Sequence, residues 1–143
     1  MRPLPRLHAI TDDAILADAD VGIRAAAIAA AGPAAALHVR GRDSSAAFLA
    51  KCATRFTSLA TPAEAAVIIN ARPDLARAVD AQGAAWRRAT SRWGRAARPG
   101  PGWIGRSVHG VAESREAIDE ARTISCWGPS SRPHRIPAGR DSA

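Results

Sequence analysis

The chain has 143 residues, of which 47% are hydrophobic, and a formal net charge of +7. This length and composition suit one globular domain and exclude a disordered chain. No apolar run approaches the ~20 residues of a membrane span, so a membrane is excluded as a partner. Two distant cysteines without metal-type spacing, and an N-terminus without a signal-peptide core, predict a reduced, cytoplasmic protein.

Short apolar runs in the first half of the chain predict three strands, at residues 7–11, 35–40 and 65–69. The third run is apolar on both faces, which is typical of a parallel strand that is covered on both sides. Asp12 and Asp13 close the first strand, and we expect them to serve the turn that follows it.

A helix-forming stretch follows each of these strands. The first is expected to begin at Asp18 or Asp20 and to end at Gly32, which can adopt the left-handed conformation found after helices. Ser44 is expected to cap the second helix. Pro73 suits the first turn of the third, where its missing N–H costs nothing.

The alternation weakens after Gly83, because residues 84–88 make a poor strand where a fourth one is due. Residues 103–108 restore the pattern as a strand, and a helix is predicted over 111–121. Repeated strand–helix units predict a parallel α/β sheet, either doubly wound or closed into a barrel. A (β/α)8 TIM barrel needs about 200 residues. We therefore expect a partial barrel with about five βα units, its closing strands missing.

Two basic segments interrupt the pattern. Residues 84–100 have a net charge of +5 with no acidic residue, and residues 121–143 have a net charge of +3. We expect one domain over residues 1–121, with 84–100 atypical, and an irregular basic tail over 122–143. Arginine interleaved with tryptophan also occurs in nucleic-acid binders. Neither segment has the period of a helix or a strand, which argues against nucleic acid as a partner.

Polar side chains gather where the strand at 103–108 ends. The carboxyl ends of parallel strands are where α/β proteins place their chemistry, and Arg106, Ser107 and His109 lie there. Histidine transfers protons in either direction because its ordinary pKa lies near neutrality. The alternatives are that His109 is structural and that Ser107 only satisfies backbone groups nearby.

The second and third strands also end in polar residues. Arg40 and Arg42 have the guanidinium fork that suits phosphate or carboxylate, although both could be surface charges. Asn70 ends the third strand and is either a substrate contact or the cap of the next helix. His38 lies inside the second strand, where we expect a packed or lining residue rather than a ligand.

Four motifs in register resemble the thiamine phosphate synthase/TenI family of small TIM barrels. The resemblance covers about residues 7–83 and 101–120. Each motif that carries the resemblance includes part of one expected strand and the residues after it. The motifs are residues 7–13, 37–42, 68–76 and 105–109 (Gly-Arg-Ser-Val-His).

The resemblance implies one of two activities. Family synthases join a pyrimidine diphosphate to a thiazole phosphate with a magnesium ion, whereas the TenI branch is similar to thiazole tautomerase, which moves a proton and needs no metal. Synthases have an aspartate directly after the third-strand asparagine, where this chain has Ala71. Synthases usually carry glutamine at the position of His38. Both departures favour the tautomerase branch, with no cofactor, and magnesium only if the synthase alternative holds.

On this resemblance His109 is the general acid/base, and the partner is a small phosphorylated thiazole. The sequence leaves open whether the chain forms a homo-oligomer. The implied substrate and phosphate contacts are Arg40, Arg42, Asn70, Arg106 and Ser107.

The composition change at both basic segments leads to one more hypothesis, that residues 84–100 and those after 121 are translated out of frame. The chain would then be a truncated and inactive remnant, with poor stability on its own. Sequencing the gene tests this hypothesis, which fails if no neighbouring frame encodes the rest of a barrel. A cooperative thermal transition at high temperature, followed by circular dichroism, would contradict the expected poor stability.

Overall fold

The computed structural model describes residues 3–86, 102–107, 110–112, 115 and 124–126. Its strands are β1 (Leu7–Ile10), β2 (Ala35–Val39), β3 (Ala66–Asn70), β4 (Gly83–Trp86), β5 (Trp103–Arg106) and β6 (Ile124–Cys126). Its helices are α1 (Asp13–Ala17), α2 (Val21–Ala29), α3 (Ala46–Ala60) and α4 (Pro73–Ala78), with short 3-10 helices at Gly32–Ala34 and Thr61–Ala63.

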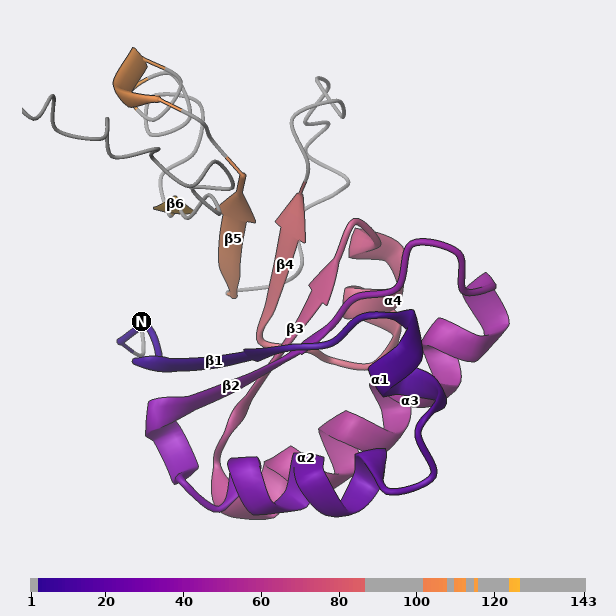
Figure 1. Ribbon diagram of the computed structural model, residues 1–143. Helices are drawn as coiled ribbons and strands as arrows, with labels where there is room; N and C mark the ends of the chain where they lie inside the picture. Colours follow the sequence, from indigo (N-terminus) through magenta and orange to yellow (C-terminus); the bar gives the residue numbers. More distant parts are fainter. Residues whose placement is uncertain (1–2, 87–101, 108–109, 113–114, 116–123, 127–143) are drawn as a thin grey trace, which may run out of the picture.

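The six strands form one parallel sheet in the order β1-β2-β3-β4-β5-β6. This order follows the sequence without reversal, whereas a doubly wound sheet reverses its strand order at a switch point. Helices α1 to α4 all gather on one side of the sheet (Figure 1). A sheet with sequential strands and helices on one side is the arrangement of a barrel wall. The predicted α/β class and partial TIM barrel are confirmed.

Two predictions about strands need correction. The weak candidate after Gly83 does form a strand, because β4 lies between β3 and β5 and is hydrogen-bonded to both. Glycine suits this position, since a Cβ on Gly83 would lie 3.0 Å from the main-chain oxygen of Trp103. The prediction of an irregular tail over 122–143 is wrong for β6, which pairs with β5. Strand β6 has three residues, which are too few for the alternating pattern of a strand to be visible in the sequence.

The first predicted helix is divided in two. Asp12 caps α1, accepting a hydrogen bond of 2.8 Å from the backbone N–H of Ile15, so it serves the turn as predicted. Asp20 stands at the start of α2 without a side-chain capping bond. That helix stops at Ala29, and Gly32, with φ of +65°, begins the 3-10 helix that leads into β2.

The start of α3 also differs from the prediction by one residue. Ser45, not Ser44, is the capping residue, and its hydroxyl accepts from the backbone N–H of Phe48 at 3.2 Å. Pro73 does occupy the first turn of α4. Of the helix predicted over 111–121, residues 111–112 and 115 are helical, and the rest lies outside the described residues.

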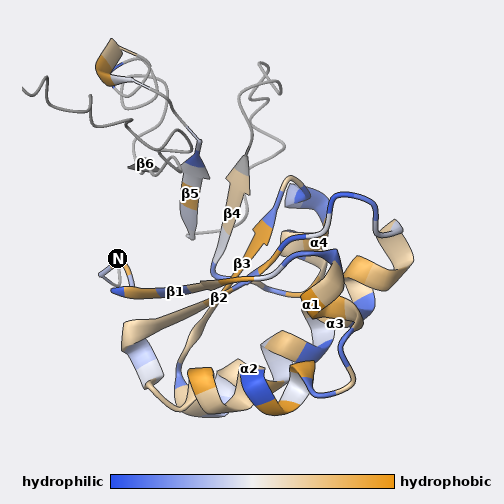
Figure 2. Ribbon diagram, in the orientation of Figure 1, coloured by the Kyte–Doolittle hydropathy of each residue, from blue (hydrophilic) through white to orange (hydrophobic). Residues whose placement is uncertain are grey.

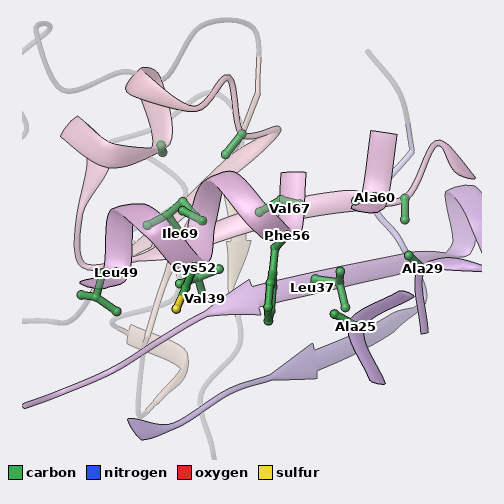
Figure 3. Packing of buried hydrophobic residues seen from close by; sticks show 14 of the residues in the cluster. Ala25, Ala29, Leu37, Val39, Leu49, Cys52, Phe56, Ala60, Val67 and Ile69 are labelled. Carbon is green, nitrogen blue, oxygen red and sulfur yellow. The ribbon is translucent and has the colours of Figure 1, made fainter. Parts of the chain in front are cut away.

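The main hydrophobic core lies between the sheet and its helices. Strand β2 alternates: Leu37 and Val39 face the helices, whereas Ala36 packs on the opposite face with Trp103. Phe56 extends from α3 toward the sheet beside Leu37 and is 2% exposed (Figure 3). Strand β3, within the sheet, is coloured as hydrophobic along its arrow (Figure 2).

Many of the core residues are alanines, which allow the helices to approach the sheet closely. The buried alanines of this cluster are Ala25, Ala29, Ala35, Ala53, Ala60, Ala65, Ala76, Ala81 and Ala84. Because alanine has little apolar surface to bury, each of the few large side chains contributes more to apolar burial than an alanine does.

Candidate functional site

The carboxyl ends of the strands meet along one edge of the sheet. Val39 pairs with Ile69, and Asn70 pairs with Ala85 on the next strand. Trp86 in turn pairs with Arg106. This register brings the polar residues at the ends of β2, β3 and β5 to the same edge, as expected for a parallel α/β site.

The predicted site residues occupy different places along this edge. Arg40 follows β2 directly and is half-buried, and Arg42 is exposed two residues later. Asn70 is the last residue of β3, on the neighbouring strand. Arg106 ends β5 and Ser107 follows it, two strands from Asn70 and both half-buried. His109 lies outside the described residues.

Thr11 joins the ends of β1 and β2. Its hydroxyl accepts from the backbone N–H of Arg40 at 2.9 Å and lies 3.0 Å from the carbonyl oxygen of His38, to which it can donate. The backbone N–H of Thr11 donates to the same carbonyl at 3.1 Å. Thr11 is buried, so these bonds fix the backbone from which the Arg40 side chain extends.

Asp13 holds the loop that carries Arg42. One carboxylate oxygen accepts from the backbone N–H of Arg42 at 2.8 Å. The other accepts from the backbone N–H of Ser44 at 3.0 Å and from its hydroxyl. Hydrogen bonds to an anionic acceptor are stronger than neutral ones and favour the charged form. The Ser44 hydroxyl and the backbone N–H of Arg42 accordingly hold the pKa of Asp13 below its ordinary value of 3.8.

We expect Asp13→Asn to lower the melting temperature at pH 7. The folded-state pKa of Asp13 lies below its unfolded-state value. The carboxylate therefore stabilises the fold above about pH 4, and this contribution is lost as the pH falls through the folded-state pKa. Melting curves of the variant and the wild type, recorded at pH 7 and near pH 3, should show a lower melting temperature for the variant at pH 7 and a smaller difference near pH 3. Asp43→Asn, on the same loop, is the control, and an equal loss there would contradict this assignment.

A row of three polar side chains crosses from β1 to β3. His8 Nδ1 lies 3.0 Å from His38 Nε2, and His38 Nδ1 lies 3.1 Å from the Asn70 side-chain oxygen. At the other end, His8 Nε2 lies 2.8 Å from the carbonyl oxygen of Pro5. The alternative prediction that Asn70 caps the next helix is wrong: Arg72 occupies that position, without a side-chain capping bond.

His38 is completely buried within β2, as expected for a packed or lining residue. Burial disfavours the charged imidazolium and lowers the pKa of His38 to about 4. The contact with Asn70 opposes this shift, and the charge of His8 adds to it. His38 is therefore neutral at pH 7.

The end of β3 does not fit a magnesium ion. Ala71 offers no oxygen ligand, and Arg72 brings a positive charge paired with Asp74, with Nε 2.9 Å from a carboxylate oxygen. Magnesium requires carboxylate or other oxygen ligands. Among the described residues, no three His, Cys, Asp or Glu side chains are grouped so that they could hold a metal.

Ala71 has a left-handed backbone conformation, with φ of +62°. Its N–H donates to the carbonyl oxygen of Ala85 at 2.6 Å, which ties the turn to β4. For a residue with a Cβ this conformation costs about 1–2 kcal/mol. The turn that follows β3 is therefore locally strained at Ala71.

Replacing Ala71 by glycine should raise the free energy of unfolding by about 0.5–1 kcal/mol. Relief of the left-handed strain exceeds the added flexibility of glycine in the unfolded chain, which costs about 0.4–1 kcal/mol. Urea denaturation measures the difference. Ala47→Gly, at an exposed position of α3, is the matched control and should lower stability by about 1 kcal/mol. A loss of stability in Ala71→Gly would count against the strain.

Sequence reasoning missed the contacts of His8, the row it forms with His38, and the loop contacts of Asp13. A weak signal for the row was present, because both histidines interrupt apolar strands. Whether His8 lies opposite His38 depends on the register of β1 against β2, and the sequence does not provide this register. The reach of Asp13 to a loop about 30 residues later left no local pattern at all.

None of the helices in the described part of the chain is long and apolar enough to cross a bilayer. The family model described as thiamine monophosphate synthase matches residues 7–132. No curated protein matches the chain.

A solved structure with a similar fold is the thiamine phosphate pyrophosphorylase from Pyrococcus furiosus, with a TM-score of 0.63 and 20% sequence identity. The match covers 85% of this chain and 59% of that one, so the chain spans less than two thirds of the length of this relative. At this identity the similarity establishes the fold.

Proposed function

Because the chain belongs to the thiamine monophosphate synthase family, we propose that it acts in thiamine biosynthesis by proton transfer on a thiazole phosphate. The observation that carries this choice is the end of β3, where Ala71 and the paired Arg72 give no ligands for magnesium. A proton transfer needs no metal, so this chemistry is compatible with the residues present.

The phosphate of the substrate would bind near the end of β2. Thr11 fixes the backbone of Arg40, and Asp13 fixes the loop of Arg42. A guanidinium held on a fixed backbone loses less freedom when it binds an anion. Arg40 and Arg42 are accordingly the proposed phosphate or carboxylate contacts, with Asn70, Arg106 and Ser107 along the same edge as further contacts.

His109 is the proposed general acid/base. Its neutral form removes a proton from the substrate, and the resulting imidazolium returns a proton to a different atom of the same molecule. This cycle leaves the enzyme unchanged and needs neither an oxidant nor a second substrate.

The competing function is the synthase reaction, a transfer that joins a pyrimidine diphosphate to a thiazole phosphate. It is favoured by the description of the matching family and by the name of the solved relative. On this alternative Ala71 is a tolerated substitution, and other residues of the whole protein would hold magnesium.

Two assays on the purified chain separate the candidates. We expect conversion of a thiazole carboxylate phosphate tautomer, followed by ultraviolet absorbance, to be unaffected by EDTA. Release of pyrophosphate from the pyrimidine diphosphate, dependent on magnesium, would overturn the proposal in favour of the synthase. Arg40→Ala should raise KM for the phosphorylated substrate, whereas Arg24→Ala, a surface arginine paired with Asp18, should leave it unchanged.

A further inference from the structure

The side chain of Asn70 lies on the face of the sheet opposite the helices. His38 on β2 pairs with Ile68 on β3, and Asn70 follows Ile68 by two residues, so these three side chains share one face. Ile68 packs on this face with Ala36 and Trp103. Asn70 is half-buried and is the last residue of β3, so its amide lies at the carboxyl edge of the sheet.

The oxygen and the nitrogen of the Asn70 amide have different surroundings. The oxygen Oδ1 lies 3.1 Å from His38 Nδ1 on β2. On the other side Asn70 pairs with Ala85 of β4, whose side chain has no hydrogen-bonding group. Within the part of the chain that the structure describes, the amide nitrogen Nδ2 has no hydrogen-bond partner. The nitrogen is therefore the end of the amide that can bind a ligand.

The contact at Oδ1 decides which group donates. An amide oxygen can only accept, so the proton in this bond is carried by His38 Nδ1. This holds for a neutral ring with its proton on Nδ1 and equally for an imidazolium. It also holds whatever the other ring nitrogen contacts and whatever the charge of His8. Burial lowers the pKa of His38 to about 4, and the bond to Asn70 opposes this shift, as an acceptor does.

His38 is a donor in a fixed position. Its side chain is 0% exposed, and its strand lies between β1 and β3. The Asn70 amide, at the end of a strand, could otherwise turn about its Cβ–Cγ bond and exchange oxygen with nitrogen. Turning it over would place its N–H against the N–H of His38 and leave a buried donor without an acceptor, which is unfavourable. The buried ring therefore fixes the orientation of the half-buried amide.

We propose that His38 is a positioning residue, whose Nδ1–H holds the Asn70 oxygen and so makes the Asn70 amide N–H groups available as donors at the carboxyl edge of the sheet. This inference deepens the proposed function and rests on it for the identity of the ligand. The substrate atom that faces Asn70 is an acceptor, either an oxygen or a ring nitrogen. A substrate with an N–H or O–H donor at that point is disfavoured.

Nitrogen-15 NMR of the full chain tests the donor directly, because long-range proton–nitrogen correlations distinguish a protonated ring nitrogen from a bare one. We expect His38 Nδ1 to carry a proton at pH 7. A bare Nδ1 would mean that the amide nitrogen of Asn70 faces His38, and it would overturn the proposal. This readout does not depend on turnover. A protonated Nδ1 in a chain without tautomerase activity contradicts the proposed function alone, and a bare Nδ1 in an active chain contradicts this inference alone.

Two substitutions of His38 test the effect on binding. His38→Asn keeps an amide N–H close to the position of Nδ1, whereas His38→Leu has a similar shape and no donor. We expect His38→Leu to raise KM for the thiazole carboxylate phosphate about 2- to 10-fold, the effect of one hydrogen bond, and His38→Asn to raise it less. Equal KM values in the two variants, with both folded by circular dichroism, would overturn the proposal. If the leucine variant does not fold, the NMR result on the wild type decides.

Discussion

Replacing Phe56 by alanine should lower the free energy of unfolding by about 3–5 kcal/mol. Phe56 is the largest of the completely buried side chains, and it extends from α3 into the space beside Leu37 of β2 (Figure 3). The surrounding alanines have short side chains that cannot move into the gap, so a cavity remains. Urea denaturation followed by circular dichroism measures the loss.

Ile23→Ala is the matched control for this variant. Ile23 lies on α2 and is 70% exposed, so its truncation removes little buried surface. Its effect should stay within about 0.5 kcal/mol. Similar losses in both variants would indicate that the Phe56 cluster is not the main core. Domains of this kind are stable by only about 5–15 kcal/mol. The Phe56 variant of a chain near the lower limit would be largely unfolded.

On the proposed function, replacing His109 by asparagine should reduce the rate of thiazole tautomerisation by about 10²- to 10⁴-fold, which is the usual contribution of a general acid/base. Asparagine keeps the approximate size and a hydrogen-bonding group, but it cannot take up a proton near neutral pH. If Arg40 and Arg42 bind the substrate as proposed, binding is retained in this variant, and the loss should appear in kcat rather than in KM.

The control for His109 is His134, a histidine that is not among the proposed site residues, replaced in the same way. Its asparagine variant should keep the wild-type rate. If His109→Asn also keeps that rate, another residue transfers the proton and the assignment is wrong. If both KM and kcat change in proportion, His109 contributes to binding as well as to the proton transfer.

The sequence predicted the positions of β1, β2 and β3 well because each of these strands is a short apolar run bounded by helix-forming residues. It failed at β4, where Gly83 and two alanines have little strand propensity and depend on the strands on either side. It failed also at Ser45, since two adjacent serines offer the same cap and only the backbone conformation decides between them.

The candidate site was also predicted only in part. Arg40, Asn70, Arg106 and Ser107 were predicted at strand ends, and parallel pairing brings those ends to one edge. The contacts that prepare the site were not predicted. The bonds from Asp13 to the Arg42 loop, and the row through His38, join residues about 30 positions apart whose proximity depends on register.

The sequential strand order has a consequence for how the chain folds. Among the described strands, each pairs with its neighbours in the sequence, and the pairings β1–β2, β2–β3 and β3–β4 each close a loop of one βα unit. Short loops cost little entropy to close, and topologies of low contact order fold quickly. The sheet can therefore grow one unit at a time during synthesis, with each later strand added to an existing template.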